Sequence, residues 1–103
     1  MAFKIPREIT PEALAARLDN GESLRIIDVR EPQEWMEGHI AGATHIQLGQ
    51  LLERKHELDP SQEMFMVCRS GGRSGLACEM LSERGFNVVN MTGGLLDWKG
   101  ELV

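Results

Sequence analysis

The chain has 103 residues, of which 42% are hydrophobic and 26% are charged, a composition typical of one small globular domain, so we expect a single domain over residues 1–103. Its formal net charge is -5, and the lack of a basic stripe argues against a nucleic-acid partner. No apolar run approaches the ~20 residues of a membrane span, and the first residues do not resemble a secretory signal, so we expect a cytoplasmic protein without a membrane partner. Two cysteines are too few for a disulfide framework or a thiolate zinc site, and no cofactor is expected.

The chain begins with a predicted helix followed by a predicted buried strand. Thr10 before Pro11 is typical of a helix N-terminus, and Asn20-Gly21 is typical of the end of that helix. The stretch 24–30 is mostly apolar and rich in β-branched residues, which favours a strand buried on both faces of a parallel sheet. Asp28 and Arg30 then lie at the carboxyl end of this strand.

The segment that follows contains shorter elements. We predict a short helical piece at residues 32–36, a loop over 38–43 and a very short strand at 45–46. Leu48, together with leucines at 51 and 52, recurs at helical spacing and predicts a further helical segment.

The second half repeats the strand and helix pattern. Residues 64–68 predict a strand and residues 74–84 a helix, with Gly85 as the left-handed residue after its last turn and Phe86 packing back onto it. A last strand is expected at Val88-Val89, a turn at 93–94 and a terminal helix at 95–99. Strands that alternate with helices predict a parallel α/β sheet with helices on both faces.

Cys68 is the leading candidate for a functional residue. It ends an apolar strand and precedes a glycine-rich turn and a helix, so turn N–H groups and the positive end of the helix can stabilise a thiolate. Arg69 and Arg73 flank the turn, and no acidic residue occurs between Glu63 and Glu79. We therefore expect a lowered thiol pKa and a reactive thiolate near neutral pH.

Four motifs, in order and spacing, resemble those of the single-domain rhodaneses. The resemblance covers nearly the whole chain and rests on residues 26–31, on 34–35 with 38–43, and on 67–74 and 93–98. It implies a rhodanese-like fold with five mainly parallel strands flanked by helices. It also implies that Cys68 is the catalytic residue, and that the substrate-binding loop consists of Arg69, Ser70, Gly71, Gly72, Arg73 and Ser74.

The implied activity is sulfur transfer of the thiosulfate:cyanide type. A sulfane sulfur would pass from thiosulfate or a persulfide to cyanide or a thiol, through a persulfide on Cys68. The two arginines would attract anionic donors, and a β-branched residue at Gly72 would obstruct the loop N–H groups. A protein could also be the sulfur acceptor, and no metal is involved.

The sequence is also compatible with two other functions. The domain could be a sulfur carrier or regulatory module that serves a partner protein. A phosphatase or arsenate reductase is less favoured, because phosphatases of this fold separate cysteine and arginine by five residues, whereas four separate Cys68 from Arg73. For Arg73, pairing with a neighbouring carboxylate is the alternative to donor binding.

The remaining chemistry-bearing residues are predicted to be structural. Cys78 is expected to be a buried small hydrophobe. Asp28 and Arg30 are expected to brace the loop without entering catalysis. The other residues in this group lack metal-ligand spacing or have packing roles: His39, His45, His56, Trp35 and Trp98.

Overall fold

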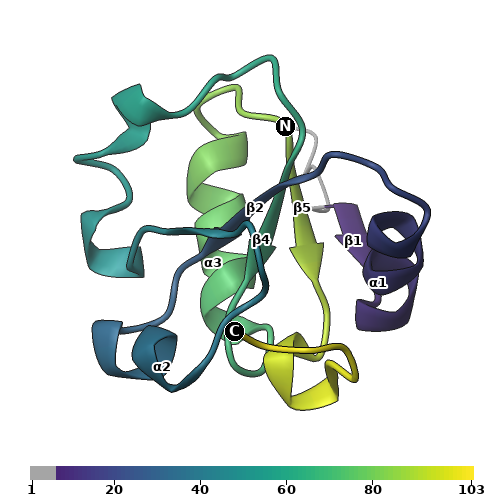
Figure 1. The fold of residues 1–103 in the computed structure, drawn as a ribbon. Coiled ribbons are helices and arrows are strands. Elements are labelled where there is room, and N and C mark those ends of the chain that lie inside the picture. The colour runs from purple at the N-terminus through teal and green to yellow at the C-terminus, as the bar shows by residue number, and fades with distance from the viewer. Residues whose placement is uncertain (1–6) are drawn as a thin grey trace.

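The computed structural model describes residues 7–103, which form a five-stranded parallel sheet with helices packed against it (Figure 1). The strands are β1 (Arg7–Ile9), β2 (Arg25–Asp28), β3 (Thr44–His45), β4 (Met64–Val67) and β5 (Val88–Met91), in the order β1-β5-β4-β2-β3. The α-helices are α1 (Pro11–Asp19), α2 (Pro32–Glu37) and α3 (Gly72–Ser82). Three 3₁₀ helices complete the fold: η1 (Leu48–Gln50), η2 (Lys55–Glu57) and η3 (Gly94–Asp97). The predicted α/β fold is therefore confirmed.

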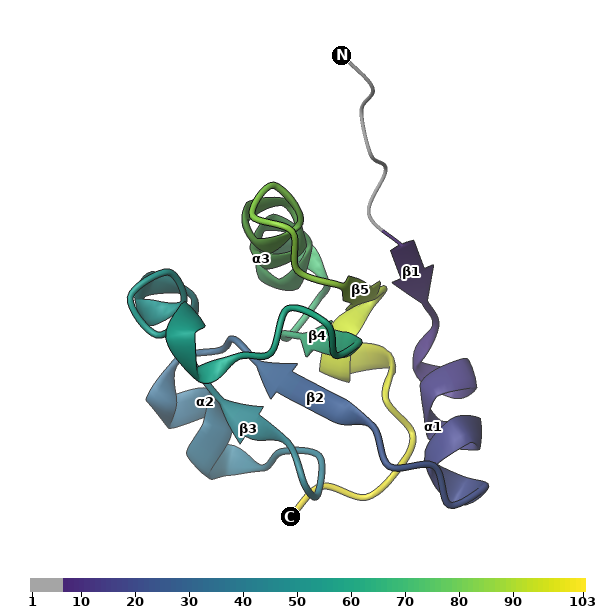
Figure 2. The ribbon, with the colours of Figure 1, turned by 90° about the horizontal axis from the view of Figure 1, so that it is seen from above.

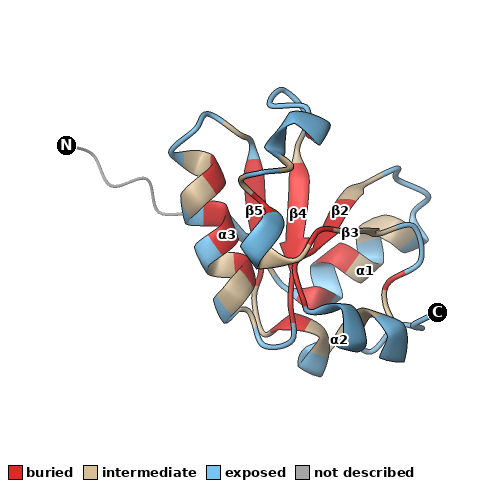
Figure 3. Cartoon of the chain, turned by 90° about the vertical axis from the view of Figure 1, so that its left-hand side faces the viewer, coloured by how far each residue is buried: buried red, intermediate tan, exposed pale blue. Residues whose placement is uncertain are grey.

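Two apolar layers cover the two faces of the sheet. Alternate residues of a strand point to opposite faces, so Met64 and Met66 of β4 belong to one layer while Phe65 and Val67 belong to the other. The first layer includes Leu81 of α3 and the second includes Leu14 of α1. Figure 2 shows α3 and α1 on opposite sides of the strands. The central strands are buried on both faces (Figure 3), which explains their nearly continuous apolar sequence.

Local capping signals fix the ends of the two longer helices. The Thr10 hydroxyl accepts a hydrogen bond from Ala13 N–H at 3.1 Å, as its N-cap position predicts. At the end of α3, Gly85 has φ 85°. The Phe86 N–H donates to Leu81 O at 3.1 Å, and both side chains pack in the same apolar layer. The expected glycine cap of α3 is thus confirmed.

Several boundaries differ from the sequence-based expectations. The predicted strand at 24–30 is shorter, ending at Asp28, and the predicted strand at 45–46 lies one residue earlier. In place of the predicted longer helices, the segment from Leu48 onward contains two short 3₁₀ helices, η1 and η2, joined by a turn over residues 51–54, and the terminal segment contains the short η3. Each of these 3₁₀ helices buries few side chains of its own, and tertiary packing is what stabilises most longer helices. Strand β1 carries no periodic signal of its own and owes its position to pairing with β5.

Cys68 lies at the middle of the sheet's carboxyl edge. Strand β4, which it follows, pairs with β2 on one side and β5 on the other. Ligand sites in parallel sheets lie beyond this edge. Within residues 7–103, no helix is long and apolar enough to cross a membrane.

Candidate active site

Cys68 has no solvent-exposed surface and sits beneath the turn that joins β4 to α3. Its Sγ accepts a hydrogen bond from Gly71 N–H at 3.0 Å and lies 3.3 Å from the Ser74 hydroxyl. Gly71 has φ 100°, a conformation that L side chains rarely adopt, and this conformation turns its N–H back toward the sulfur. The turn and the first residues of α3 therefore form a cradle around the thiol, as expected.

The surroundings of Cys68 favour its thiolate. Burial alone raises the pKa of the Cys68 thiol. The thiolate is stabilised by hydrogen bonds from the Ser74 hydroxyl and from the N–H groups of Ser74, Gly71 and Ser70. Together these hydrogen bonds outweigh burial, so the pKa of Cys68 falls below its ordinary value of 9.0. Cys78 is equally inaccessible but lies among the apolar side chains of α3 and β4. Burial raises the pKa of Cys78 to about 12, next to the negative charge of Glu79. Only Cys68 is thus prepared for nucleophilic chemistry.

Asn90 is a site residue that the sequence reasoning missed. It lies in β5 with 8% of its surface exposed, and its Oδ1 lies 2.6 Å from the Ser74 hydroxyl oxygen. The single hydroxyl proton of Ser74 is therefore shared between Asn90 Oδ1 and the Cys68 sulfur, which lies 3.3 Å away. Asn90 Nδ2 donates to Gly71 O at 3.3 Å. Asn90 therefore holds both residues that contact the sulfur. The available signal was an amide within the apolar run of β5, where a buried polar group needs partners.

The turn at Gly93-Gly94 supports the cradle from the far side. Leu95 N–H donates to Cys68 O at 2.9 Å, and Leu96 N–H donates to Arg69 O at 3.0 Å. A Cβ atom on Gly94 would lie 2.4 Å from the carbonyl carbon of Arg69, so only glycine permits this approach. The expected turn therefore has a specific role, which is to hold the backbone of the loop that follows Cys68.

In the structure, the loop position that requires glycine is Gly71, whereas the sequence-based prediction placed this requirement at Gly72. A Cβ atom on Gly72 would meet nothing within 4 Å, and this residue begins α3 with ordinary helical geometry. A Cβ atom on Gly71 would lie 3.2 Å from Gly93 N, at a backbone conformation with positive φ. The sequence alone did not distinguish the two glycines.

Arg73 is engaged by a carboxylate. Its Nη1 and Nη2 atoms donate to the two carboxylate oxygens of Glu34 in α2, at 2.6 and 2.9 Å. The guanidinium lowers the pKa of Glu34 to about 2. The alternative of an arginine paired with a carboxylate is thus realised, although the carboxylate comes from a position 39 residues away rather than from a sequence neighbour. Arg69 is exposed at the start of the loop.

Asp28 and Arg30 form a buried ion pair, 2.8 Å between Arg30 Nη2 and Asp28 Oδ2, as their expected bracing role suggests. Arg30 also donates to the backbone oxygens of Glu34 at 3.1 Å and Gly38 at 2.7 Å. The pair therefore fixes α2 and the residue after it, and this position of α2 holds Glu34 against the loop that follows Cys68.

The histidines and tryptophans have structural contacts. His39 stacks on Trp35 with ring centroids 3.5 Å apart. His45 Nε2 lies 2.7 Å from Arg30 O, while Trp98 packs against the apolar layer that includes α1. Among residues 7–103 no group of three or more metal-ligating side chains occurs.

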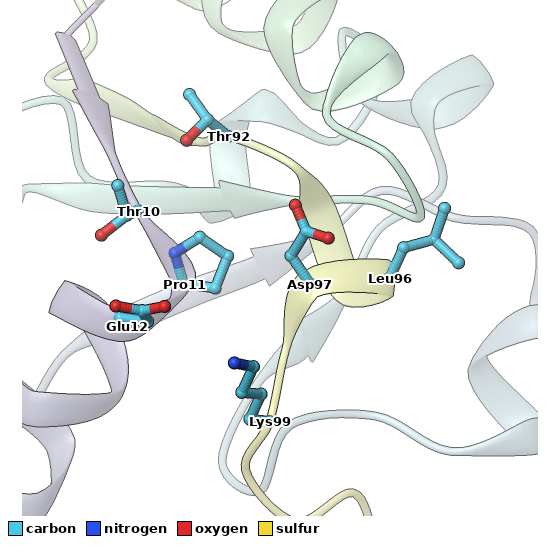
Figure 4. A pocket seen from close by; sticks show the side chains of 7 residues that line it. All are labelled: Thr10, Pro11, Glu12, Thr92, Leu96, Asp97 and Lys99. Carbon is cyan, nitrogen blue, oxygen red and sulfur yellow. The ribbon is translucent and has the colours of Figure 1, made fainter.

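Two open pockets lie near the carboxyl edge of the sheet without including Cys68. One of about 420 Å³ lies between the start of α1 and η3 (Figure 4). It is lined by Thr10, Pro11, Glu12, Thr92, Leu96, Asp97 and Lys99. A second, of about 450 Å³, borders Gly71, Gly72 and Asn90 on the outer side of the cradle.

Comparisons with known proteins agree with this geometry. The model of the rhodanese-like domain family matches residues 10–101. In Bacillus subtilis, "Putative sulfurtransferase YtwF" is 43% identical over 95 residues, covering 92% of this chain and 92% of that protein. "Putative sulfur carrier protein YrkF" from the same organism is 42% identical over 101 residues, covering 97% of this chain and 54% of that protein.

Two further matches extend the comparison. "Thiosulfate sulfurtransferase GlpE" of Pseudomonas entomophila is 35% identical over 95 residues, covering 90% of this chain and 84% of that protein. The crystal structure of a rhodanese-like domain protein from Staphylococcus aureus superposes with a TM-score of 0.89 at 28% identity, covering 94% of this chain and 96% of that one. The expected resemblance is thereby confirmed, and the relatives carry the names of sulfurtransferases or a sulfur carrier.

Proposed function

Because the chain belongs to the rhodanese-like domain family, we propose that it is a sulfurtransferase in which Cys68 carries the transferred sulfur as a persulfide. The observation that carries the proposal is the environment of Sγ: a buried thiol at the end of β4 that accepts a hydrogen bond from Gly71 N–H and has its pKa lowered. This arrangement suits a nucleophile that must hold negative charge both before and after it takes up sulfur.

The first half-reaction loads the cysteine. The Cys68 thiolate attacks the outer sulfur of thiosulfate or of a persulfide, a new S–S bond forms on Cys68, and the old S–S bond breaks. Its electron pair leaves with sulfite or with the donor thiolate. The N–H groups of Ser70, Gly71 and Ser74 stabilise the negative charge on the enzyme sulfur.

The second half-reaction returns the free thiolate. A thiolate or cyanide attacks the outer sulfur of the Cys68 persulfide and leaves as a new persulfide or as thiocyanate, with the electron pair of the broken S–S bond remaining on Cys68. In this scheme the loop from Arg69 to Ser74 binds the donor and acceptor, and no metal or cofactor takes part. The acceptor is cyanide, a small thiol or a thiol of a partner protein.

The loop length supports sulfur transfer over phosphate chemistry. Only four residues separate Cys68 from Arg73, and both terminal nitrogens of Arg73 are bonded to Glu34. The short cradle encloses the cysteine sulfur, and the arginine that would hold phosphate oxygens is engaged elsewhere. We therefore do not favour a phosphatase or an arsenate reductase.

Intact-protein mass spectrometry tests the proposal. Treatment with thiosulfate or glutathione persulfide should add the mass of one sulfur atom, and cyanide should remove it. Cys68→Ser should not gain this mass, whereas Cys78→Ser should gain it as the wild type does. Absence of the added sulfur in the wild type with both donors would refute the proposal.

A sulfur-carrier role is the second candidate, since YrkF bears that name. It predicts that Cys68 is loaded but releases its sulfur to small thiols and cyanide much more slowly than it was loaded. Steady turnover with cyanide or dithiothreitol as the acceptor supports the enzyme over the carrier.

A further inference from the structure

We propose that Glu34 is a specificity-determining residue, which makes the Cys68 site favour sulfur donors of low net charge, such as organic persulfides, over the thiosulfate dianion. The inference rests on the sulfur-transfer function proposed above. It concerns a residue of α2, outside the catalytic loop.

The first support is the geometry of the ion pair between Glu34 and Arg73. Both terminal nitrogens of Arg73 donate to Glu34 oxygens, so the paired donors that guanidinium presents to an oxyanion are already occupied. The pair is partly buried, with 34% of the Arg73 side chain and 24% of the Glu34 side chain exposed. A sulfonate group that arrives at the loop must therefore compete with a fixed carboxylate for Arg73.

The second support is that Glu34 is held firmly in place. Its Oε1 accepts a hydrogen bond from Glu31 N–H at 3.0 Å, which closes the first turn of α2. Its backbone oxygen accepts from Arg30, which is itself anchored on Asp28. The carboxylate therefore cannot swing away from the loop without disturbing α2.

The third support is the balance of charge at the loop. The Cys68 thiolate attracts the positive charge of Arg73, but the carboxylates of Glu34 and Glu31 attract the same charge. The pKa of Glu34 lies at about 2, so its carboxylate is ionised at neutral pH. Of the two loop arginines, only Arg69 is left without a carboxylate partner among the described residues.

These charges affect the two donor classes differently. An organic persulfide brings its negative charge on the sulfur that is transferred, where the backbone N–H groups stabilise it. Thiosulfate brings a further charge on a sulfonate, which the Glu34 carboxylate repels and which finds Arg73 occupied. Removal of the Glu34 charge should raise kcat/KM for thiosulfate relative to kcat/KM for an organic persulfide by roughly tenfold, which corresponds to ~1.4 kcal/mol.

The test compares two donors on the same protein. One is thiosulfate, and the other is cysteamine persulfide, whose ammonium group brings its net charge close to zero. The measured quantity is the ratio of kcat/KM for thiosulfate to kcat/KM for cysteamine persulfide, which does not depend on the fraction of folded enzyme. Glu34→Gln should raise this ratio about tenfold, whereas Glu37→Gln, which removes the same charge from an exposed position at the end of α2, should leave it unchanged.

Results that contradict the role of Glu34 can be distinguished from results that contradict sulfur transfer itself. An unchanged ratio in Glu34→Gln, or an equal rise in both variants, overturns the assignment of Glu34 while leaving sulfur transfer intact. Failure of both donors to load sulfur on the wild-type Cys68, read by intact mass, overturns the proposed function and this inference with it.

Discussion

Replacement of Gly94 by alanine should damage both the stability of the protein and the reactivity of Cys68. Gly94 has φ +62°, and a Cβ atom there would lie 2.4 Å from the Arg69 carbonyl carbon and 2.5 Å from Ser70 N. Neither contact is to a flexible side chain, so the backbone of the turn and the backbone of the catalytic loop must separate.

The cost of Gly94→Ala has two parts. Alanine in the left-handed region costs ~1 kcal/mol relative to glycine. Separation of the two backbones also breaks the hydrogen bonds from Leu95 N–H to Cys68 O and from Leu96 N–H to Arg69 O, each contributing ~1 kcal/mol. The total is ~3 kcal/mol or somewhat more, which is less than the 5–15 kcal/mol stability of a typical domain, so we expect the variant to fold.

Gly85→Ala is the matched control. Gly85 has φ +85°, and a Cβ atom there would meet nothing within 4 Å. This variant therefore carries the conformational cost of ~1 kcal/mol without the steric contact. The difference between the two variants isolates the contact between the Gly93-Gly94 turn and the catalytic loop.

Urea unfolding and alkylation of Cys68 by iodoacetamide are the measurements. We expect Gly94→Ala to lose ~2 kcal/mol more unfolding free energy than Gly85→Ala, and to shift the alkylation midpoint of Cys68 to higher pH as the cradle is displaced. Equal unfolding free energies and equal alkylation profiles in the two variants would show that the loop does not depend on this contact.

Three further predictions concern the charges and thiols of the site. Ser74→Ala should raise the pKa of Cys68, because the Ser74 hydroxyl contributes the largest of the hydrogen bonds that lower it. The pH profile of alkylation should therefore move upward, and an unmoved profile would contradict this role. Cys78→Ser should still load sulfur, but it should lose ~1–3 kcal/mol of unfolding free energy because a hydroxyl replaces a thiol among apolar side chains. A loss of loading as complete as in Cys68→Ser would show that a second thiol is essential. The ionised Glu34 should stabilise the fold by ~1–2 kcal/mol, a value reduced by the partial exposure of its partner. The pKa of Glu34 falls from 4.5 to about 2 on folding. The difference in unfolding free energy between wild type and Glu34→Gln should therefore be complete above pH 4.5 and disappear as the pH falls through about 2. A difference that does not depend on pH would contradict a stabilising ion pair.

The elements whose signals are local could be predicted from the amino-acid sequence. The Thr10 cap, the Gly85 cap, the apolar run of β4 and the glycine-rich turn after Cys68 each depend on a few neighbouring residues, and each was placed correctly or within one or two positions. Alternation of strands and helices was enough to predict the parallel sheet and to place Cys68 at its carboxyl edge. The candidate nucleophile and the lowered pKa of its thiol therefore follow from local sequence.

Several of the side chains and backbone groups that surround this candidate nucleophile come from distant parts of the chain, so they could not be predicted from the sequence. The loop is locally basic in sequence, yet Glu34, 39 residues earlier, neutralises Arg73. Asn90 reaches Ser74 from a neighbouring strand, and the need for glycine at position 94 arises from the backbone of Arg69. Strand β1 likewise exists through its pairing with β5. These contacts join segments that are distant in the chain. Charge attraction and steric contact act between atoms that are close in space, so the partner of each residue depends on how the layers pack and not on its sequence neighbours.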